Sequence, residues 1–241
     1  MTESRPPAVW FTEEQPRKPR LSRDRIARGA VALLDAEGVA GLSMRRLAAR
    51  LNAGAMSLYE YVGGKEDVLD LALDAVMGEI ELDGAGAGGA GDPDRPRHLP
   101  WRDALTRQLV LTRDAMKRHP WLPALMATRP LLGPNSLARS EYFYSVLDRA
   151  GLEGPRLTAA VGSLTYYVQG YAATENVWRG LRHDPAQEAE LRERAQRFID
   201  HRAADHPALA RHAQLANSDF DGSFTLGLET ILDGIEAQLS H

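Results

Sequence analysis

Apolar residues in this chain of 241 residues recur every three or four positions, which is the period of an α-helix. No stretch alternates between apolar and polar residues as a half-buried strand would. Most prolines fall in or beside the gaps between the apolar patterns, where they do not interrupt a helix. The spacing predicts an all-α fold, with later helices near residues 101–118, 121–127, 133–150, 156–179, 187–203 and 219–239.

Four shorter helices are expected near the N-terminus, at 23–38, 44–51, 55–62 and 65–80. Ser22 and Ser43 stand where the N-caps of the first two helices belong, and Gly38 ends the first. The second ends at Asn52-Ala53-Gly54, because Asn and Gly tolerate the left-handed backbone of a tight turn. Residues 43–62 therefore have the spacing of a helix-turn-helix, whose second helix can lie in the major groove of DNA.

The polar residues of this segment are more informative than its apolar residues. The apolar positions would look the same in any small helical bundle, so they indicate only a core. The exposed remainder provides cationic and hydroxyl donors of the kind that position a protein on phosphates. These donors are Ser43, Arg45, Arg46, Arg50, Ser57, Tyr59, Tyr61 and Lys65. For Arg46 and Arg50, a solvated helix face remains an equally good interpretation.

The net charge of −4 averages two unlike parts of the chain. Residues 17–65 contain ten Lys and Arg against four Asp and Glu, a net charge of +6. Residues 66–241 contain 18 against 26, a net charge of −8. This asymmetry indicates that the first part contacts a polyanion and the second does not.

Several classes of protein are excluded by what the sequence lacks. With no cysteine, it has no disulfide framework, thiolate metal site or cysteine nucleophile. It has no secretory signal and no run of 18 apolar residues, which favours a cytoplasmic protein that contacts no membrane. His201, His206 and His212 do not share one helical face, so we expect no metal. The sequence has no nucleophile elbow and no His-Glu-x-x-His zinc signature, so we expect no cofactor and no enzymatic activity.

Two parts of the chain resemble a known family. Gly41-Leu42-Ser43-Met44-Arg45-Arg46-Leu47-Ala48 with Ser57-Leu58-Tyr59 and Tyr61-Val62 looks like the DNA-binding domain of the tetracycline-repressor (TetR) family. His119-Pro120-Trp121, Thr128-Arg129-Pro130 and Gly133-Pro134-Asn135 are similar to the C-terminal domain of the branch that contains the tetracycline repressors. The resemblance implies a DNA-binding domain at 21–66 and a helical ligand-binding and dimerisation domain at 67–241. The composition of residues 1–20 predicts a disordered tail, and that of residues 83–100 predicts a flexible linker.

The resemblance also implies which residues contact DNA, which is expected to be a double-stranded, palindromic operator. The groove-facing side of the recognition helix would carry Ala55, Met56, Ser57, Tyr59 and Tyr61, with Ser43, Arg45 and Lys65 as further phosphate or base contacts. Ala55 and Met56 offer no hydrogen bond to a base edge. Direct readout would therefore depend on the other residues, or on contacts with thymine methyl groups.

A homodimer formed by two helices of each subunit is a further implication. Two apolar stripes fit it: Leu157, Val161, Leu164, Val168 and Tyr171 in the first helix, and Phe224, Leu228, Ile231 and Ile235 in the second. Packing within a single chain would explain either stripe as well, and the residues alone leave that alternative open.

The resemblance finally implies a small-molecule effector bound among the helices that follow the linker. Candidate contacts are Gln108, Thr112, Met126, Thr128, Arg129, Glu141, Tyr142, Val161, Thr165 and Gln169. Among them Arg129 would suit an anionic or carbonyl-bearing ligand. The tetracycline repressors bind a magnesium-chelated drug with a histidine just before the Thr-Arg-Pro element. Here Leu125 or Met126 occupies that position, which disfavours such a ligand.

Together these features predict a ligand-responsive regulator that represses transcription until a small molecule releases it from its operator. Two alternatives remain open at this point. One is an activator of the same family, and the other is a helical ligand-binding or interaction protein whose helix-turn-helix no longer binds DNA.

Overall fold

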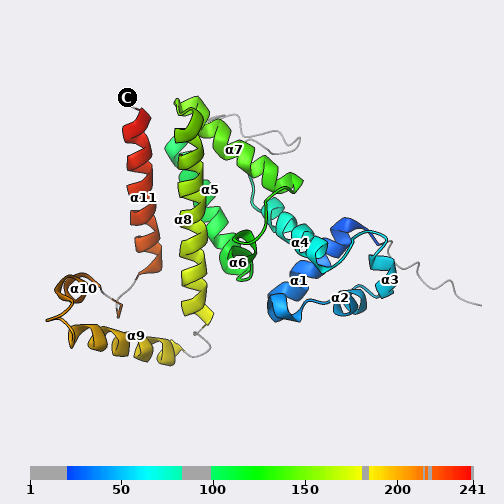
Figure 1. Cartoon of the computed structure of the whole chain (residues 1–241), viewed down its shortest axis with the longest axis horizontal. Helices are drawn as coiled ribbons and strands as arrows, with labels where there is room; N and C mark the ends of the chain where they lie inside the picture. The colour runs from blue at the N-terminus through cyan, green and yellow to red at the C-terminus, as the bar shows by residue number, and fades with distance from the viewer. Residues whose placement is uncertain (1–20, 83–98, 181–184, 214, 217–218, 240–241) are drawn as a thin grey trace, which may run out of the picture.

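The computed structural model describes residues 21–82, 99–180, 185–213, 215–216 and 219–239, and every regular element in these ranges is a helix. The helices are α1 (Arg23–Gly41), α2 (Met44–Arg50), α3 (Ala55–Leu58), α4 (Lys65–Glu79), α5 (Trp101–Arg118), α6 (Leu122–Met126), α7 (Pro134–Ala150), α8 (Gly154–Gly180), α9 (Pro185–Asp200), α10 (Pro207–His212) and α11 (Phe220–Leu239). In Figure 1, α1 to α3 form a small group at one side, which we call the headpiece, and α5 to α11 form a larger body. The predicted all-α fold is confirmed.

The headpiece helices begin where the sequence predicts. The Ser22 hydroxyl accepts a hydrogen bond from the Arg25 amide at 3.2 Å, and the Ser43 hydroxyl accepts one from the Arg46 amide at 3.3 Å. Each bond satisfies an amide that the first turn of a helix leaves without a partner. The two serines therefore set the starts of α1 and α2.

Residues with positive φ provide the reversals between these helices. Gly38 has a φ of 66° and interrupts α1 near its end, and Asn52 has a φ of 50° in the turn after α2. The left-handed region costs glycine nothing and asparagine little. The predicted break at 52–54 therefore lies where the chain turns into α3.

The recognition helix α3 is shorter than predicted. Its α-helical part ends at Leu58 rather than Val62, and the chain continues in tight turns. In these turns the Tyr59 amide donates to the Met56 carbonyl and the Tyr61 amide to the Leu58 carbonyl. The Val62 amide also donates to the Leu58 carbonyl, so the continuation mixes hydrogen bonds that span three and four residues.

Helix α4 joins the headpiece to the body. Ile26 of α1, Leu47 of α2 and Leu58 of α3 are completely buried, and they belong to the same hydrophobic core as the buried Val68 of α4. The same helix continues past α1 to pack on α6 and α7 (Figure 1). A movement of α4 relative to the body would therefore displace α1 to α3 as a unit.

The apolar stripes predicted for a dimer interface lie mostly inside one chain. Six of the nine residues are buried, and the other three are partly buried against the same core: Leu157, Leu164, Val168, Phe224, Leu228 and Ile235, then Val161, Tyr171 and Ile231. The cause is that α11 runs alongside α8 in the opposite direction, so the stripes pack within the body (Figure 1). Packing within one chain therefore accounts for the six buried side chains, and a place for these stripes at a subunit interface stays a prediction.

A buried arginine ties three helices of the body together. Arg113 of α5 donates from Nε to Glu175 of α8 at 2.8 Å, and another of its guanidinium nitrogens lies 2.8 Å from Asp221 of α11. Its guanidinium also covers the ring of Phe224 at 4.7 Å from the ring centre. Only 6% and 5% of the Arg113 and Glu175 side chains are exposed, so neither charge is solvated.

The remaining sequence-based boundaries agree with the structure to within a few residues, with one addition. The helix predicted at 187–203 ends at Asp200, and a separate short helix, α10, begins at Pro207. Proline is favoured in the first turn of a helix, where its missing amide costs nothing. The predicted tail at 1–20 and the linker residues 83–98 lie outside the described residues. Among the described helices, none has both the length and the apolar character needed to cross a membrane.

Candidate functional site

The outer surface of the headpiece presents the predicted recognition residues to solvent. Met56 is 78% exposed and Tyr59 48% exposed, and Ala55 is also exposed. Ser57 is half-buried beside them. The surface thus presents an apolar and an aromatic side chain together with a hydroxyl, side-chain types that can contact thymine methyl groups and base edges.

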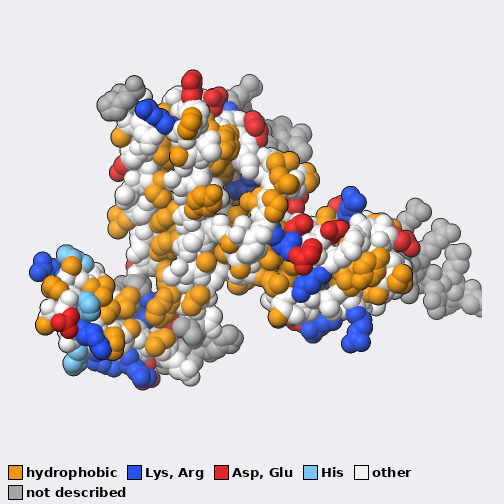
Figure 2. All heavy atoms as spheres, viewed as in Figure 1, with side chains coloured by type: hydrophobic (Ala, Val, Ile, Leu, Met, Phe, Trp, Pro, Cys, Tyr) orange, Lys and Arg blue, Asp and Glu red, His pale blue; other side chains and the backbone are white. Residues whose placement is uncertain are grey.

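Cationic side chains flank this surface on α2. Arg45 and Arg50 are exposed, and neither makes a hydrogen bond or ion pair with any residue that the structure describes. Arg46 differs, because it pairs with Glu37 and donates to the Gly41 carbonyl at 3.3 Å. Figure 2 shows basic side chains projecting from the edge of the headpiece where α1 and α2 lie. Of the two arginines left open by the sequence, Arg50 is available to a phosphate and Arg46 is engaged.

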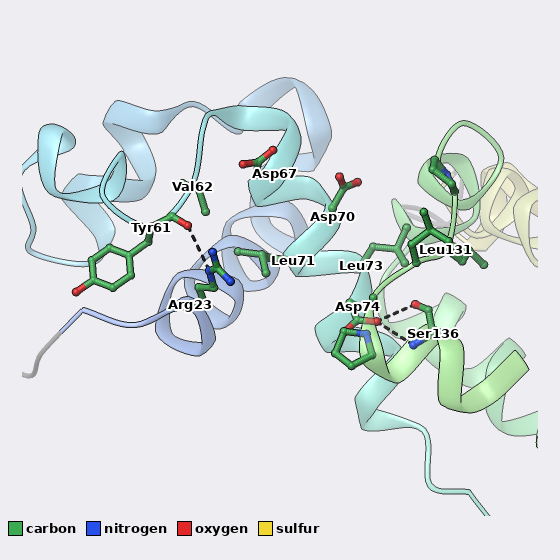
Figure 3. A pocket seen from close by; sticks show the side chains of 14 residues that line it. Arg23, Tyr61, Val62, Asp67, Asp70, Leu71, Leu73, Asp74, Leu131 and Ser136 are labelled. Atoms are coloured by element: carbon green, nitrogen blue, oxygen red, sulfur yellow. Dashed lines mark hydrogen bonds between the residues drawn. The ribbon is translucent and has the colours of Figure 1, made fainter. Parts of the chain in front are cut away.

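Lys65 and Tyr61 have structural contacts as well. The Lys65 ammonium donates to the Val39 carbonyl at 3.0 Å, and it has two further protons for a phosphate at the start of α4. The Tyr61 carbonyl accepts from Arg23 at 3.3 Å, and its half-buried ring packs against the core (Figure 3). Tyr61 therefore contributes to the packing of the headpiece, and its ring is less exposed than that of Tyr59.

The headpiece is held to the body through α4. The Asp74 carboxylate accepts from the Ser136 amide at 2.8 Å and from its hydroxyl at 2.9 Å, which satisfies the N-terminus of α7 (Figure 3). His119, after α5, places Nδ1 2.8 Å from Asp35 of α1 and Nε2 3.1 Å from Glu79 of α4. These contacts connect the body to both α1 and α4.

Arg129 takes part in the same connection. Its guanidinium pairs with Glu66 and, at 2.7 Å, with Asp70, both on α4. Its charge is thus neutralised within the protein, and it lines neither of the cavities described below. The prediction that Arg129 provides the cation for an effector stays a prediction, and these ion pairs do not favour it. A solvent-open hollow of about 320 Å³ lies close by, between α1, α4 and the α6–α7 connection (Figure 3).

A smaller cavity of about 60 Å³ lies within the body. Its lining comes from five helices and from the connection after α6: Met77, Leu109, Thr112, Met126, Leu131, Ser136, Arg139, Ser140, Phe143, Val161, Thr165 and Val168. Four of these twelve were predicted as ligand contacts: Thr112, Met126, Val161 and Thr165. Gln108 is buried just behind them and accepts from Arg139 at 3.2 Å.

The other predicted ligand contacts lie elsewhere. Thr128 is exposed and donates to backbone carbonyls of its own turn, and Glu141 is exposed on α7. Tyr142 is half-buried without lining the cavity, and the Gln169 amide donates to the Pro123 carbonyl at 3.0 Å on the outer side of α8. Helix rotation places these residues on other faces, which spacing along the chain alone did not reveal.

Sequence reasoning missed the one charged side chain of the cavity lining, Arg139. It donates to Thr112 at 2.6 Å as well as to Gln108, and burial lowers the pKa of its guanidinium to about 10, so it stays charged at neutral pH. A signal was present, because Ser136, Arg139, Ser140 and Phe143 follow the i, i+3, i+4, i+7 pattern of a buried face. A charge on such a face is unusual enough to indicate a site.

An exposed helix-turn-helix surface and a separate internal cavity, joined by α4, define a DNA-binding regulator with an effector site. Comparison with known proteins agrees. Residues 26–72 match the family model described as bacterial regulatory proteins, tetR family, and residues 93–239 match that of the tetracyclin repressor-like C-terminal domain.

Whole-chain similarity extends to named relatives. The chain is 42% identical over 238 residues to an HTH-type transcriptional regulator of Saccharopolyspora erythraea, covering 98% of this chain and 94% of that protein. It is 36% identical over 240 residues to the HTH-type transcriptional repressor DrrR1 of Streptomyces coeruleorubidus, covering 97% and 85%. The crystal structure of ActR from Streptomyces coelicolor in complex with actinorhodin matches with a TM-score of 0.75 and 28% identity, over 92% of this chain and 100% of that chain.

The chain therefore belongs to the TetR family. It is a ligand-responsive, DNA-binding transcriptional repressor.

Proposed function

We propose that the chain works as a homodimer, which holds a palindromic operator through two headpieces and releases it when a small molecule fills the cavity of the body. The observation that carries this proposal is the exposed surface formed by Met56 and Tyr59, beside Arg45 and Arg50, which have no partner among the described residues. Two such surfaces related by a two-fold axis would read two half-sites of opposite orientation.

The coupling between the two sites runs through α7 and α4. Ser136 lines the cavity and also donates to Asp74, so a ligand that displaces α7 disturbs the contact that holds α4. Because α4 packs along α1, a change in its position alters the distance between the two headpieces of a dimer. Only one distance between the two headpieces fits an operator, and the ligand would favour the conformation in which that distance differs.

DNA binding by this surface is expected to depend steeply on salt. If Arg45, Arg50 and Lys65 of both subunits neutralise phosphates, the slope of log K against log salt is about −5, roughly a thousandfold loss between about 50 and 200 mM salt. Replacing Arg50 by alanine should make this slope shallower by about 2, because a dimer loses two contacts. The measurement is a salt titration on DNA fragments that the purified protein itself selects.

Arg46→Ala is the matched control for this titration, because Arg46 already pairs with Glu37 and its loss should change the slope by less than about 1. A flat response with weak binding at every salt concentration would contradict the repressor function. It would favour a binding protein whose helix-turn-helix no longer contacts DNA.

For the dimer we propose the outer faces of α8 and α11 in place of the buried stripes. Tyr166 and Val177 on α8 are 74% and 66% exposed, and Leu226 on α11 is 66% exposed. Leu226→Glu should weaken the dimer by roughly a hundredfold, because a carboxylate in each subunit would lose its water without gaining a partner. Sedimentation over a range of concentrations measures this change.

Leu137→Glu serves as the control for Leu226→Glu, since Leu137 is 51% exposed on α7, away from α8 and α11. It should leave the sedimentation profile unchanged. An unaltered dimer in Leu226→Glu would contradict the proposed interface.

A further inference from the structure

Arg139 is a buried charge without a counter-ion among the residues that the structure describes. Its relative exposure is 7%, and it makes no ion pair with any of the described carboxylates. Its two described hydrogen bonds go to the neutral acceptors Gln108 and Thr112. Because a guanidinium has five N–H donors, these bonds leave it with donors to spare.

The other buried arginines of the body are arranged differently. Arg113 has Glu175 at 2.8 Å, and Arg192 has Glu188 at 2.7 Å. The fold therefore supplies a carboxylate wherever it buries an arginine for structure, and Arg139 is the exception among the described residues. Burying an unneutralised charge destabilises a protein, so its retention at a cavity needs a reason other than stability.

The rest of the cavity lining constrains the ligand further. The hydroxyls of Ser136, Ser140 and Thr165 already donate to protein acceptors. The remaining walls are largely apolar and include Phe143 and Met126. A molecule in this cavity would thus meet one cationic group on an apolar surface.

We infer that the effector carries an ionised acidic group, such as a carboxylate, sulfonate or acidic phenol, which pairs with Arg139 while an aromatic or other apolar skeleton packs against Phe143 and Met126. This inference rests on the proposed function, because it names the chemical class of the effector. A volume of about 60 Å³ holds the acidic group and the edge of a ring. The flexible side chains of Met77 and Met126 can move aside for the remainder.

An anion at Arg139 would also act on the link to DNA. Arg139 lies one turn after Ser136 on α7, and Ser136 is one of two neighbouring residues that donate hydrogen bonds to Asp74 of α4, the other being Asn135. Drawing Arg139 toward a ligand would turn or shift α7 at that point. The pair between Arg139 and the anion would therefore lie on the same face of α7 as the Ser136 contact with Asp74 of α4.

Two fluorescent dyes test the inference. 8-Anilinonaphthalene-1-sulfonate is anionic, and N-phenyl-1-naphthylamine has the same ring system without the sulfonate. The wild-type chain should bind the anionic dye more tightly than the neutral one. Arg139→Gln should lower the affinity for the anionic dye by roughly ten- to a hundredfold and change the affinity for the neutral dye little. Arg139→Lys keeps the charge and should retain much of the preference. Arg149→Gln, an exposed arginine in the last turn of α7, should behave as wild type.

The same samples are assayed for operator binding, so that two kinds of failure are distinguished. If wild type binds its selected DNA but shows no preference for the anionic dye, or binds neither dye, the inference is wrong and the repressor function stands. If Arg139→Gln keeps the full preference, the anion binds elsewhere and the inference is equally wrong. Loss of DNA binding by the wild-type chain would instead contradict the proposed function. Circular dichroism of Arg139→Gln establishes that the variant is folded.

Discussion

Tyr59→Ala is expected to abolish operator binding while leaving the dimer and the fold intact. The ring is 48% exposed on the recognition surface and is not part of the hydrophobic core. Loss of one specific DNA contact costs about 1–3 kcal/mol, and a dimer with two headpieces loses it twice, which corresponds to a weakening of roughly thirtyfold to twenty-thousandfold. Titration of the selected operator by fluorescence anisotropy measures the change.

The control for Tyr59→Ala is the same substitution at Tyr144, whose ring is 37% exposed on α7 in the body. Tyr144→Ala should bind the operator as the wild type does. Sedimentation of both variants should give the wild-type dimer. Operator affinity within threefold of wild type in Tyr59→Ala would remove this residue from the reading surface, and a monomer would mean that it has a structural role.

Glu175→Gln should lower the free energy of unfolding by about 3–5 kcal/mol. The substitution removes the buried carboxylate that neutralises Arg113 and leaves that guanidinium with Asp221, whose side chain is 80% exposed. Removing one partner of a buried pair leaves the other charge buried and unneutralised, which is strongly destabilising. Replacing both partners by apolar residues destabilises a protein far less. The midpoint temperature of thermal unfolding, measured at a fixed protein concentration, should fall by roughly 6–15 °C for a chain of this size.

Glu193→Gln is the matched control, because Glu193 pairs with Arg197 on the exposed side of α9, with side chains 63% and 59% exposed. Exposed pairs of this kind contribute about 0–1 kcal/mol. A second variant, Arg113→Met with Glu175→Leu, removes both charges and should recover part of the loss. If the free energy of unfolding of Glu175→Gln lies within about 1 kcal/mol of that of the wild type, the stability of the junction of α5, α8 and α11 does not depend on this pair.

The headpiece was predictable from sequence because its signals are local. Ser22 and Ser43 cap helices through residues three positions away, and Asn52 turns the chain by its own backbone preference. The exposed recognition residues follow from the same short segment. What the sequence could not reveal is that Arg46 is engaged, since its partner Glu37 depends on how α1 and α2 pack.

The candidate effector cavity was only partly predictable because it is assembled from distant segments. Thr112, Met126 and Val161 meet in one cavity, but Arg129, three residues after Met126, turns to α4 instead. Arg139 was overlooked because a charged residue on a helix is normally at the surface. Its role becomes visible only when Gln108 and Thr112 are seen beside it without a carboxylate.

By itself the sequence determined the class of fold, the positions of most helices and the candidate surface for reading DNA. These depend on helical period, caps and turn residues, which act over a few positions along the chain. The tertiary structure alone decided that the stripes of α8 and α11 face each other and that Arg129 binds α4. It also decided that Arg139 provides the cation of the cavity. Each depends on which helix faces are brought together, and that follows from packing between segments far apart in the chain.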